Sequence, residues 1–388
     1  MKLHISTLVI LIAAACVDRI DIEVSKPKSD AISIGGYISN QPGPYEIRIQ
    51  NVYDIESKET LRSPVSVKEI ALSDNQGNSE ILEEVRPGFY LTHVNGMQGV
   101  IGNAYKIRIE LWDGRIYESW PDTIKAPGKL DSMYYSVRNE IDNSGSKLYF
   151  LDVFFNATYK ATPDANLIWK FRGTFQAETQ PELYFEYHMS SGLWTGLCFY
   201  LDEIFKCNLQ PPCSGLRNIG FGRSPVFERQ FPCSCCTCWY NIVNRDLVLS
   251  SDLFVARGEI KGMKIQSVPL NEWTLLNKIR LSTEQHSLTK NSFKYYKAIQ
   301  NQKEAIGSLF QPVTGQIPSN FKQLSGSIVR AEGLFYATAL SAKVKYITKD
   351  DLPFEIYDQL PRVPPFFPDD CRLLFPNATN IKPTFWVD

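Results

Sequence analysis

The sequence predicts a mainly β protein, in which an N-terminal immunoglobulin-like β-sandwich is followed by a larger strand-rich, disulfide-stapled domain with about one helix. Three observations predict this architecture. Short segments that alternate apolar and polar residues recur along the chain, aromatic residues make up 12% of it, and the stretch PCSCCTCWY, residues 232–240, holds four cysteines. Alternation with a period of two is typical of half-buried strands, and aromatic side chains pack well on pleated sheets.

The first residues predict export and a lipid anchor. MKLHISTLVILIAAAC has one basic residue, Lys2, then an apolar run too short to span a bilayer, then small residues before Cys16. This pattern predicts a signal peptide over residues 1–15 and resembles a bacterial lipobox, with Ala13 where leucine is usual. Cys16 would then be acylated, and residues 16–27 would form a polar tether. The alternative is an ordinary secretory signal followed by a chance cysteine.

Residues 28–127 are predicted to form the sandwich. Apolar residues alternate with polar ones in several short segments, and the clearest is YKIRIELWDGRIYES, residues 105–119. Asp113-Gly114 inside it predicts a two-residue hairpin turn, because glycine tolerates the positive φ that such a turn requires. Strands at this spacing indicate a sandwich, and Ala126-Pro127-Gly128 is a natural boundary. We therefore expect this segment to fold on its own.

Residues 128–388 are predicted to be strand-rich but less regular. Leu167, Trp169, Phe171 and Phe175 alternate with other residues as one face of a strand. The segment 198–238 is expected to be an excursion fixed by disulfides. Thr289 can cap a helix over residues 291–305, and the proline-rich segment 351–371 is expected to be extended and irregular.

The cysteines other than Cys16 are predicted to form disulfides. An even number of cysteines in an exported chain favours such a framework. Zinc sites usually separate two CxxC pairs by a dozen or more residues, whereas the two pairs here interleave. In an extended segment, Cys233 and Cys235 would face one side, and Cys236 and Cys238 the other. A zinc site and a redox centre remain the alternatives. The eight disulfide candidates are Cys198, Cys207, Cys213, Cys233, Cys235, Cys236, Cys238 and Cys371.

Charge and motifs argue against several function classes. The chain has 41 basic and 42 acidic residues and no basic block, so a nucleic-acid-binding surface is not expected. The three histidines outside the signal segment, His93, His188 and His286, have no metal-ligand spacing. No nucleophile elbow or phosphate-binding loop is present, and Gly220-Phe221-Gly222 is a lone GxG. We therefore predict no enzymatic activity, no metal and no cofactor.

Several stretches, taken in order, carry a family resemblance. They are Cys16 with its short tether, GGYISNQPGPYEIRI, LSDNQGNSEILEEVRPGFY, YKIRIELWDGRIYESWPDTI, the Cys238-Trp239-Tyr240 triplet, SLTKNSFKYYKAIQNQKEAIGSLF, AEGLFYATA and CRLLFPNATNIKPTFW. In this order they resemble domain of unknown function family 4249, outer-membrane lipoproteins of Bacteroidetes encoded beside TonB-dependent receptors. Family members often have a further cysteine three residues before the position of Cys371, where this chain has Pro368. The departure implies that Cys371 pairs with the cysteine cluster.

The resemblance implies a location and a partner. It implies a lipid-anchored protein of the outer membrane, and Asp18, Asp21 and Glu23 resemble the acidic signals that accompany export to the cell surface in this group. The implied role is a binding or accessory subunit that works with a TonB-dependent β-barrel transporter. A surface adhesin or structural assembly component is the alternative, and a polymer hydrolase is a third class.

Overall fold

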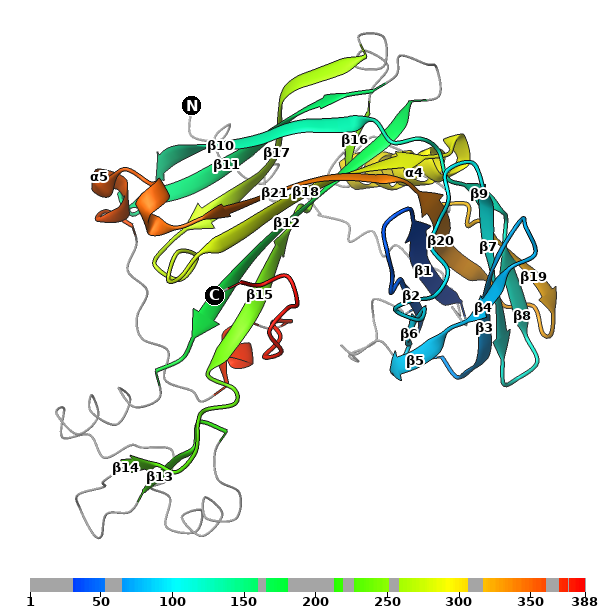
Figure 1. The fold of residues 1–388 in the computed structure, drawn as a ribbon, viewed down its shortest axis with the longest axis horizontal. Helices are drawn as coiled ribbons and strands as arrows, with labels where there is room; N and C mark the ends of the chain where they lie inside the picture. The colour runs from blue at the N-terminus through cyan, green and yellow to red at the C-terminus, as the bar shows by residue number, and fades with distance from the viewer. Residues whose placement is uncertain are drawn as a thin grey trace, which may run out of the picture.

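The computed structural model shows two β-sandwiches joined beside one long helix (Figure 1). It describes residues 31–52, 65–159, 165–180, 213–218, 227–250, 258–305, 317–360, 370–375 and 377–387. The predicted signal peptide 1–15, the tether 16–27 and Cys16 therefore lie outside the described residues. The mainly β class predicted from the sequence is confirmed.

The first sandwich has two sheets with the cluster of buried aliphatic and tyrosine side chains between them. One sheet has the order β20-β1-β2-β6-β5, and the other has the order β19-β8-β7-β3-β4, with β9 paired to β7. Ile32, Ile34 and Ile38 of β1 face the core, as their alternation predicts. The strands are β1 (Ile32–Ser39), β2 (Glu46–Asn51), β3 (Val67–Asp74), β4 (Ser79–Ile81), β5 (Glu83–Arg86), β6 (Phe89–Leu91), β7 (Ala104–Leu111), β8 (Ile116–Ser119), β9 (Asp122–Thr123), β19 (Phe321–Ser325) and β20 (Ala331–Thr338).

Two strands of this sandwich come from far along the chain, which differs from the predicted boundary at residue 127. β20 pairs in parallel with all eight residues of β1, and β19 pairs with β8. Phe335 and Ala337 of β20 are fully buried in the first core. Local alternation identifies a strand but not its neighbour, so the sequence pattern assigned residues 321–338 to the second domain.

These two strands change what is expected of the isolated segment. Without residues 321–338, β1 loses one complete ladder and the core loses Phe335. We expect residues 28–127 alone to give no cooperative unfolding transition, because exposed ladders and a missing core side chain each cost several kcal/mol. Joining residues 317–338 to this segment through a Gly/Ser linker should restore the transition in circular dichroism. Cooperative folding of the short segment alone would show that β19 and β20 are dispensable.

The predicted hairpin between β7 and β8 is present, but its loop is longer by one residue. The amide of Leu111 donates to the carbonyl of Arg115, which leaves Trp112, Asp113 and Gly114 as the loop. Gly114 has φ of 86°. A three-residue hairpin loop places its last residue in the left-handed region, so the glycine has the predicted function in a different turn type.

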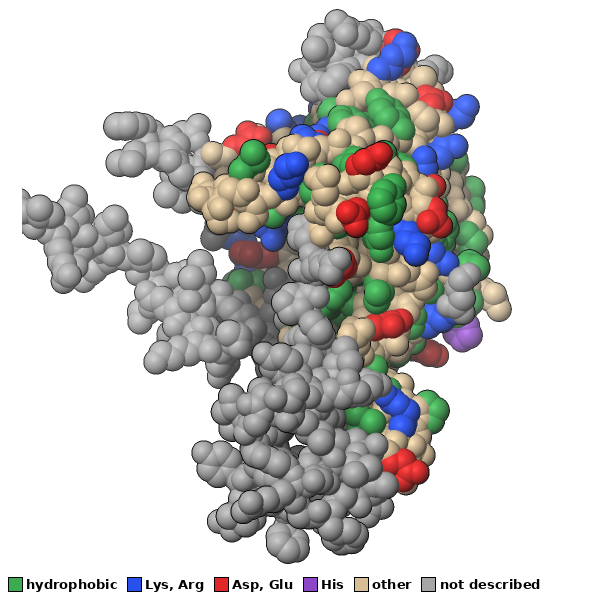
Figure 2. Space-filling view, turned by 90° about the vertical axis from the view of Figure 1, so that its left-hand side faces the viewer, with side chains coloured by type: hydrophobic (Ala, Val, Ile, Leu, Met, Phe, Trp, Pro, Cys, Tyr) green, Lys and Arg blue, Asp and Glu red, His purple; other side chains and the backbone are tan. Residues whose placement is uncertain are grey.

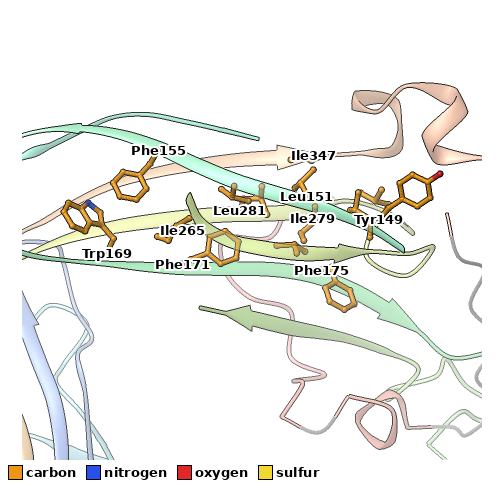
Figure 3. Close-up of a cluster of buried hydrophobic side chains, with 14 of the residues drawn as sticks. Tyr149, Leu151, Phe155, Trp169, Phe171, Phe175, Ile265, Ile279, Leu281 and Ile347 are labelled. Atoms are coloured by element: carbon orange, nitrogen blue, oxygen red, sulfur yellow. The ribbon is translucent and has the colours of Figure 1, made fainter. Parts of the chain in front are cut away.

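The second sandwich has longer strands and a core rich in aromatic side chains (Figure 3). One sheet has the order β10-β11-β17, and the other has the order β15-β12-β18-β21, with β16 paired to β12. Trp169, Phe171 and Phe175 of β12 point into this core, as their alternation predicts. The strands are β10 (Lys129–Ile141), β11 (Lys147–Thr158), β12 (Asn166–Glu178), β15 (Thr237–Val243), β16 (Val248–Leu249), β17 (Glu259–Leu270), β18 (Ile279–Leu288) and β21 (Leu340–Ile347).

Helical structure is limited to one long helix and short turns in the described residues. Helix α4 (Lys290–Ala305) matches the predicted helix, and its Phe293 amide donates to the carbonyl of Thr289. The proline-rich segment contains the short helix α5 (Phe354–Tyr357), where extended chain was expected, and the 3₁₀ turn η1 (Lys349–Asp351) leads into it. Ile356 and Tyr357 pack against the second core, and this contact accounts for the turn. The turn η2 (Cys371–Leu373) and the hairpin of β13 (Leu216–Asn218) with β14 (Phe227–Arg229) complete the described elements.

The surface carries both charges. Lysine and arginine side chains are interspersed with aspartate and glutamate on the face in Figure 2. None of the helices in the described ranges has the length and apolar character needed to cross a bilayer.

Candidate functional site

Six of the eight cysteines predicted to form disulfides lie in the described residues, and these six form three bridges. They are Cys213–Cys235, Cys233–Cys236 and Cys238–Cys371. Cys198 and Cys207 lie outside the described residues. The stretch 232–240 is therefore a hub that connects the β13–β14 hairpin, strand β15 and the C-terminal segment.

The predicted placement of Cys233 and Cys236 on opposite faces of an extended segment is wrong. Strand β15 begins at Thr237, so residues 233–236 do not follow an extended path. Cys233 and Cys236 therefore bridge to each other across a local turn. Only Cys238 lies within the strand, where it is fully buried and joined to Cys371. In the described ranges, no group of three or more histidine, cysteine, aspartate or glutamate side chains is arranged to hold a metal ion.

The C-terminal segment is fixed against β15 by more than the disulfide. Trp239 and Thr379 exchange backbone hydrogen bonds of 2.8 and 3.1 Å, and the Cys371 amide donates to the Cys235 carbonyl at 3.0 Å. Tyr240 packs against Phe375 with ring centroids 5.1 Å apart. The cysteine hub is thus a structural staple, and the chemistry of a binding site has to come from elsewhere.

The junction of the two sandwiches is the first place where polar side chains from distant segments meet. The chain passes between the sandwiches from β9 to β10, from β18 through α4 to β19, and from β20 to β21. Asp122 of β9 connects these passages. Its carboxylate accepts hydrogen bonds from the Thr289 hydroxyl at 2.5 Å, the Ser292 hydroxyl at 2.9 Å and the Ala337 amide at 3.0 Å. Burial raises the pKa of Asp122, although these three donors oppose the shift.

A second set of hydrogen bonds reinforces the same place. The Ser287 hydroxyl donates to the Lys125 carbonyl at 2.6 Å and accepts from the Ala339 amide at 3.0 Å. The Asn40 side-chain oxygen accepts from the Leu340 amide at 2.7 Å. These groups are side chain to backbone pairs, which orient the two sandwiches, and a small pocket of about 250 Å³ lies beside them, lined by Lys125 and Thr289 among others.

An aromatic cage completes the junction around a lysine. The Lys170 ammonium of β12 donates to the Tyr336 hydroxyl at 2.7 Å. It also lies 5.2, 6.0 and 5.3 Å from the ring centroids of Tyr37, Tyr296 and Tyr336. Burial raises the pKa of all three tyrosines. A partly buried cation near aromatic faces gains roughly 0.5–2 kcal/mol, and together with the hydrogen bond to Tyr336 this attraction helps to hold β1, β20 and α4 against β12.

His286 is buried beside this cage. Its side chain is completely buried, its Nε2 lies 3.3 Å from Glu284 Oε2, and its Nδ1 has no hydrogen-bond partner among the described residues. Burial, together with the nearby Lys170, lowers the pKa of His286 to about 4, while Glu284 opposes the shift. The imidazole is therefore neutral at neutral pH and cannot gain a proton without losing folding free energy.

This burial predicts a loss of stability on acidification. The unfolded chain binds a proton at its ordinary pKa of about 6.5, whereas the folded chain does so at about 4, so stability is complete above pH 6.5 and falls between these values. The expected loss is about 3 kcal/mol. Urea unfolding of wild type and His286→Gln from pH 7 to pH 4 measures it, and the variant should have the shallower pH dependence. The exposed His93→Gln change is the control, and parallel profiles for wild type and His286→Gln would contradict the assignment.

An open groove at one end of the first sandwich offers more room for a ligand than the junction pocket. It has a volume of about 630 Å³ and lies between the β3–β4 turn and the loop from residue 93 to residue 103. Half of its ten polar side chains are neutral amides, and its apolar surface includes Met97 and Val100. The amide side chains are Gln76, Asn78, Asn95, Gln98 and Asn103. A volume of this size falls within the range of small-molecule sites.

Two carboxylates hold the walls of the groove. Asp74 accepts from the backbone amides of Gln76 and Asn78, both at 2.9 Å. Glu80 accepts from the amides of His93 and Met97, both at 2.6 Å. A Cβ at Gly96 would lie 2.2 Å from the Glu80 carboxylate, so a larger residue at this position would displace that carboxylate. Both carboxylates are therefore committed to shaping the loops.

Neither the groove nor the junction was predicted as a site from the sequence. The turn-forming runs DNQGNS and NGMQG were available as a signal, because they place several amides close together in loops. Asp122 and His286 had no such signal, since their importance depends on burial that only the three-dimensional fold produces.

Comparison with known proteins gives one family. A domain of unknown function (DUF4249) matches residues 17–343, which include the first sandwich and all of the second except the end of β21. No curated protein and no solved structure matches the chain. The match covers well over half of the 388 residues. The chain therefore belongs to the DUF4249 family.

Proposed function

We propose that this protein is a lipid-anchored accessory subunit of the outer membrane that presents a ligand-binding groove to a TonB-dependent transporter. The observation that carries the proposal is that the family match starts at residue 17, directly after the predicted acylated Cys16. The family segment would thus follow its lipid anchor immediately. The resemblance to lipoproteins encoded beside TonB-dependent receptors supports the choice of partner.

The folded part of the chain suits a binding subunit. Two sandwiches connected by the Asp122 hydrogen bonds and the Lys170 cage provide a rigid body, and the groove lies on loops at one end of it. Rigid scaffolds with loops at one end are a common arrangement for binding sites, because the loops can vary while the scaffold keeps them in place. The polar side chains of the junction hold the two sandwiches together, and those of the groove are suited to hydrogen bonding. This combination favours binding over catalysis.

The anchor is tested by changing one residue. Cys16→Ala should release the protein from membranes into the soluble fraction, because acyl chains are the proposed attachment. Fractionation followed by immunoblotting measures this, with Cys16-containing wild type as reference. A variant with a processed signal that stays in the membrane in the absence of a partner would contradict the lipid anchor.

The partner is tested by isolating the native complex. The tagged wild-type protein, extracted in mild detergent, should carry a β-barrel transporter with it in a stoichiometric ratio. Mass spectrometry identifies the partner, and a tagged unrelated lipoprotein is the control. Isolation of the protein alone or as a self-assembly would instead support the adhesin or structural role.

A further inference from the structure

We propose that the groove binds an uncharged oligosaccharide, an inference that rests on the proposed binding role and names its ligand class. The charge of the groove favours a neutral ligand. No lysine or arginine lines it, so the groove holds no permanent positive charge for a phosphate, sulfate or carboxylate ligand, although His93 is among its lining residues. Its carboxylates, Asp74 and Glu80, already accept hydrogen bonds from backbone amides, so they are poorly placed to bind a cation.

Side-chain amides give the groove groups that can form hydrogen bonds to a ligand. The side-chain amides of Gln76, Asn95 and Asn103 line the groove and have no hydrogen bond to another side chain or backbone group in the described ranges. Each amide offers an acceptor oxygen and two donor hydrogens. A sugar hydroxyl both donates and accepts, so neighbouring hydroxyls on one ring can pair with the two ends of an amide.

The apolar part of the groove suits the C–H face of a sugar ring. Met97 and Val100 lie among the amides, and Val100 is 55% exposed. A pyranose ring has C–H faces and a rim of hydroxyls, which fits apolar side chains surrounded by amides.

The walls make the groove preorganised. Loops fixed by the Asp74 and Glu80 carboxylates lose little conformational entropy when a ligand binds. The Val100 amide also donates to the Tyr105 hydroxyl at 2.8 Å, which fixes the far end of the loop to strand β7.

Isothermal titration calorimetry on the purified lipoprotein in detergent tests the inference. The probes are neutral hexasaccharides of gluco, manno and xylo configuration, hexasaccharides of galacturonic acid and chondroitin sulfate, and an uncharged hexapeptide. We expect binding of at least one neutral hexasaccharide and of neither charged one. Gln76→Ala with Asn95→Ala should weaken that binding about 10-fold or more, since two hydrogen bonds are lost. Exposed amides elsewhere supply the control, Asn139→Ala with Asn301→Ala, which should bind as wild type does.

Three outcomes would overturn the inference: binding of none of the neutral hexasaccharides, preference for a charged hexasaccharide or the peptide, or unchanged affinity in the groove variant. Co-purification separates this inference from the proposed function. A groove variant that loses the sugar should still carry the transporter with it. If wild type binds the sugar through these amides but no transporter co-purifies, the accessory role fails and the sugar site stands.

Discussion

Asp122→Ala is expected to lower the free energy of unfolding by about 3 kcal/mol or more. The substitution removes the acceptor of three donors at the junction, among them the buried Ala337 amide. An unsatisfied buried donor costs roughly 1–3 kcal/mol, and two hydroxyls lose their partner as well. Urea unfolding followed by tryptophan fluorescence measures the loss. The surface change Asp350→Ala, on an exposed carboxylate, should leave the midpoint within about 0.5 kcal/mol of wild type.

Asp122→Asn refines the same experiment. Burial raises the pKa of Asp122, so the folded protein disfavours the ionised form, and a neutral amide of the same shape should be tolerated better than alanine. The amide keeps one oxygen, which can serve Ala337 and Ser292 because both donate to the same carboxylate oxygen, but it lacks the second acceptor to which Thr289 donates. We expect an intermediate loss of about 1 kcal/mol. Equal stability of wild type and both variants would show that the junction does not depend on this carboxylate.

The sequence predicted the local elements well because their signals are local. Alternation in residues 105–119 and 167–175 gave strands with the correct buried faces, and Thr289 with the apolar residues after it gave α4. The pairing of β20 with β1 was not predictable, because parallel pairing of segments about 300 residues apart leaves no trace in either strand alone. The candidate sites depend on such long-range neighbours, and so the sequence did not identify them.

The stretches that carry the family resemblance meet at the junction. YKIRIELWDGRIYESWPDTI contains Asp122, SLTKNSFKYYKAIQ contains Thr289 and Ser292, and AEGLFYATA contains Ala337. The resemblance therefore rests in part on the segments that join the sandwiches. Fixed placement of one sandwich against the other is what a subunit needs if it is to hold a ligand at a set position beside a membrane partner.

Removal of the disulfides is also expected to lower the free energy of unfolding by several kcal/mol. In the chain-entropy account, a bridge stabilises by restricting the unfolded chain, and the effect grows with the length of chain it closes. Cys238–Cys371 spans 133 residues, Cys213–Cys235 spans 22 and Cys233–Cys236 spans three. Replacing both cysteines of each bridge by alanine should therefore lower the free energy of unfolding by about 5, about 3 and about 1.5 kcal/mol in that order.

The order of the three losses distinguishes chain entropy from native contacts. If the bridges acted chiefly through contacts in the folded hub, Cys213–Cys235 and Cys238–Cys371 would give similar losses, because Cys235 and Cys238 are both buried there. Urea unfolding of the three double variants under non-reducing conditions measures the losses, with mass spectrometry of unreduced peptides confirming the remaining bridges. A loss for Cys238→Ala with Cys371→Ala no larger than that for Cys233→Ala with Cys236→Ala would contradict the entropic account. The long bridge should matter most, because without it the attachment of the C-terminal segment rests on its non-covalent contacts, among them the Trp239–Thr379 hydrogen bonds and the Tyr240–Phe375 stack.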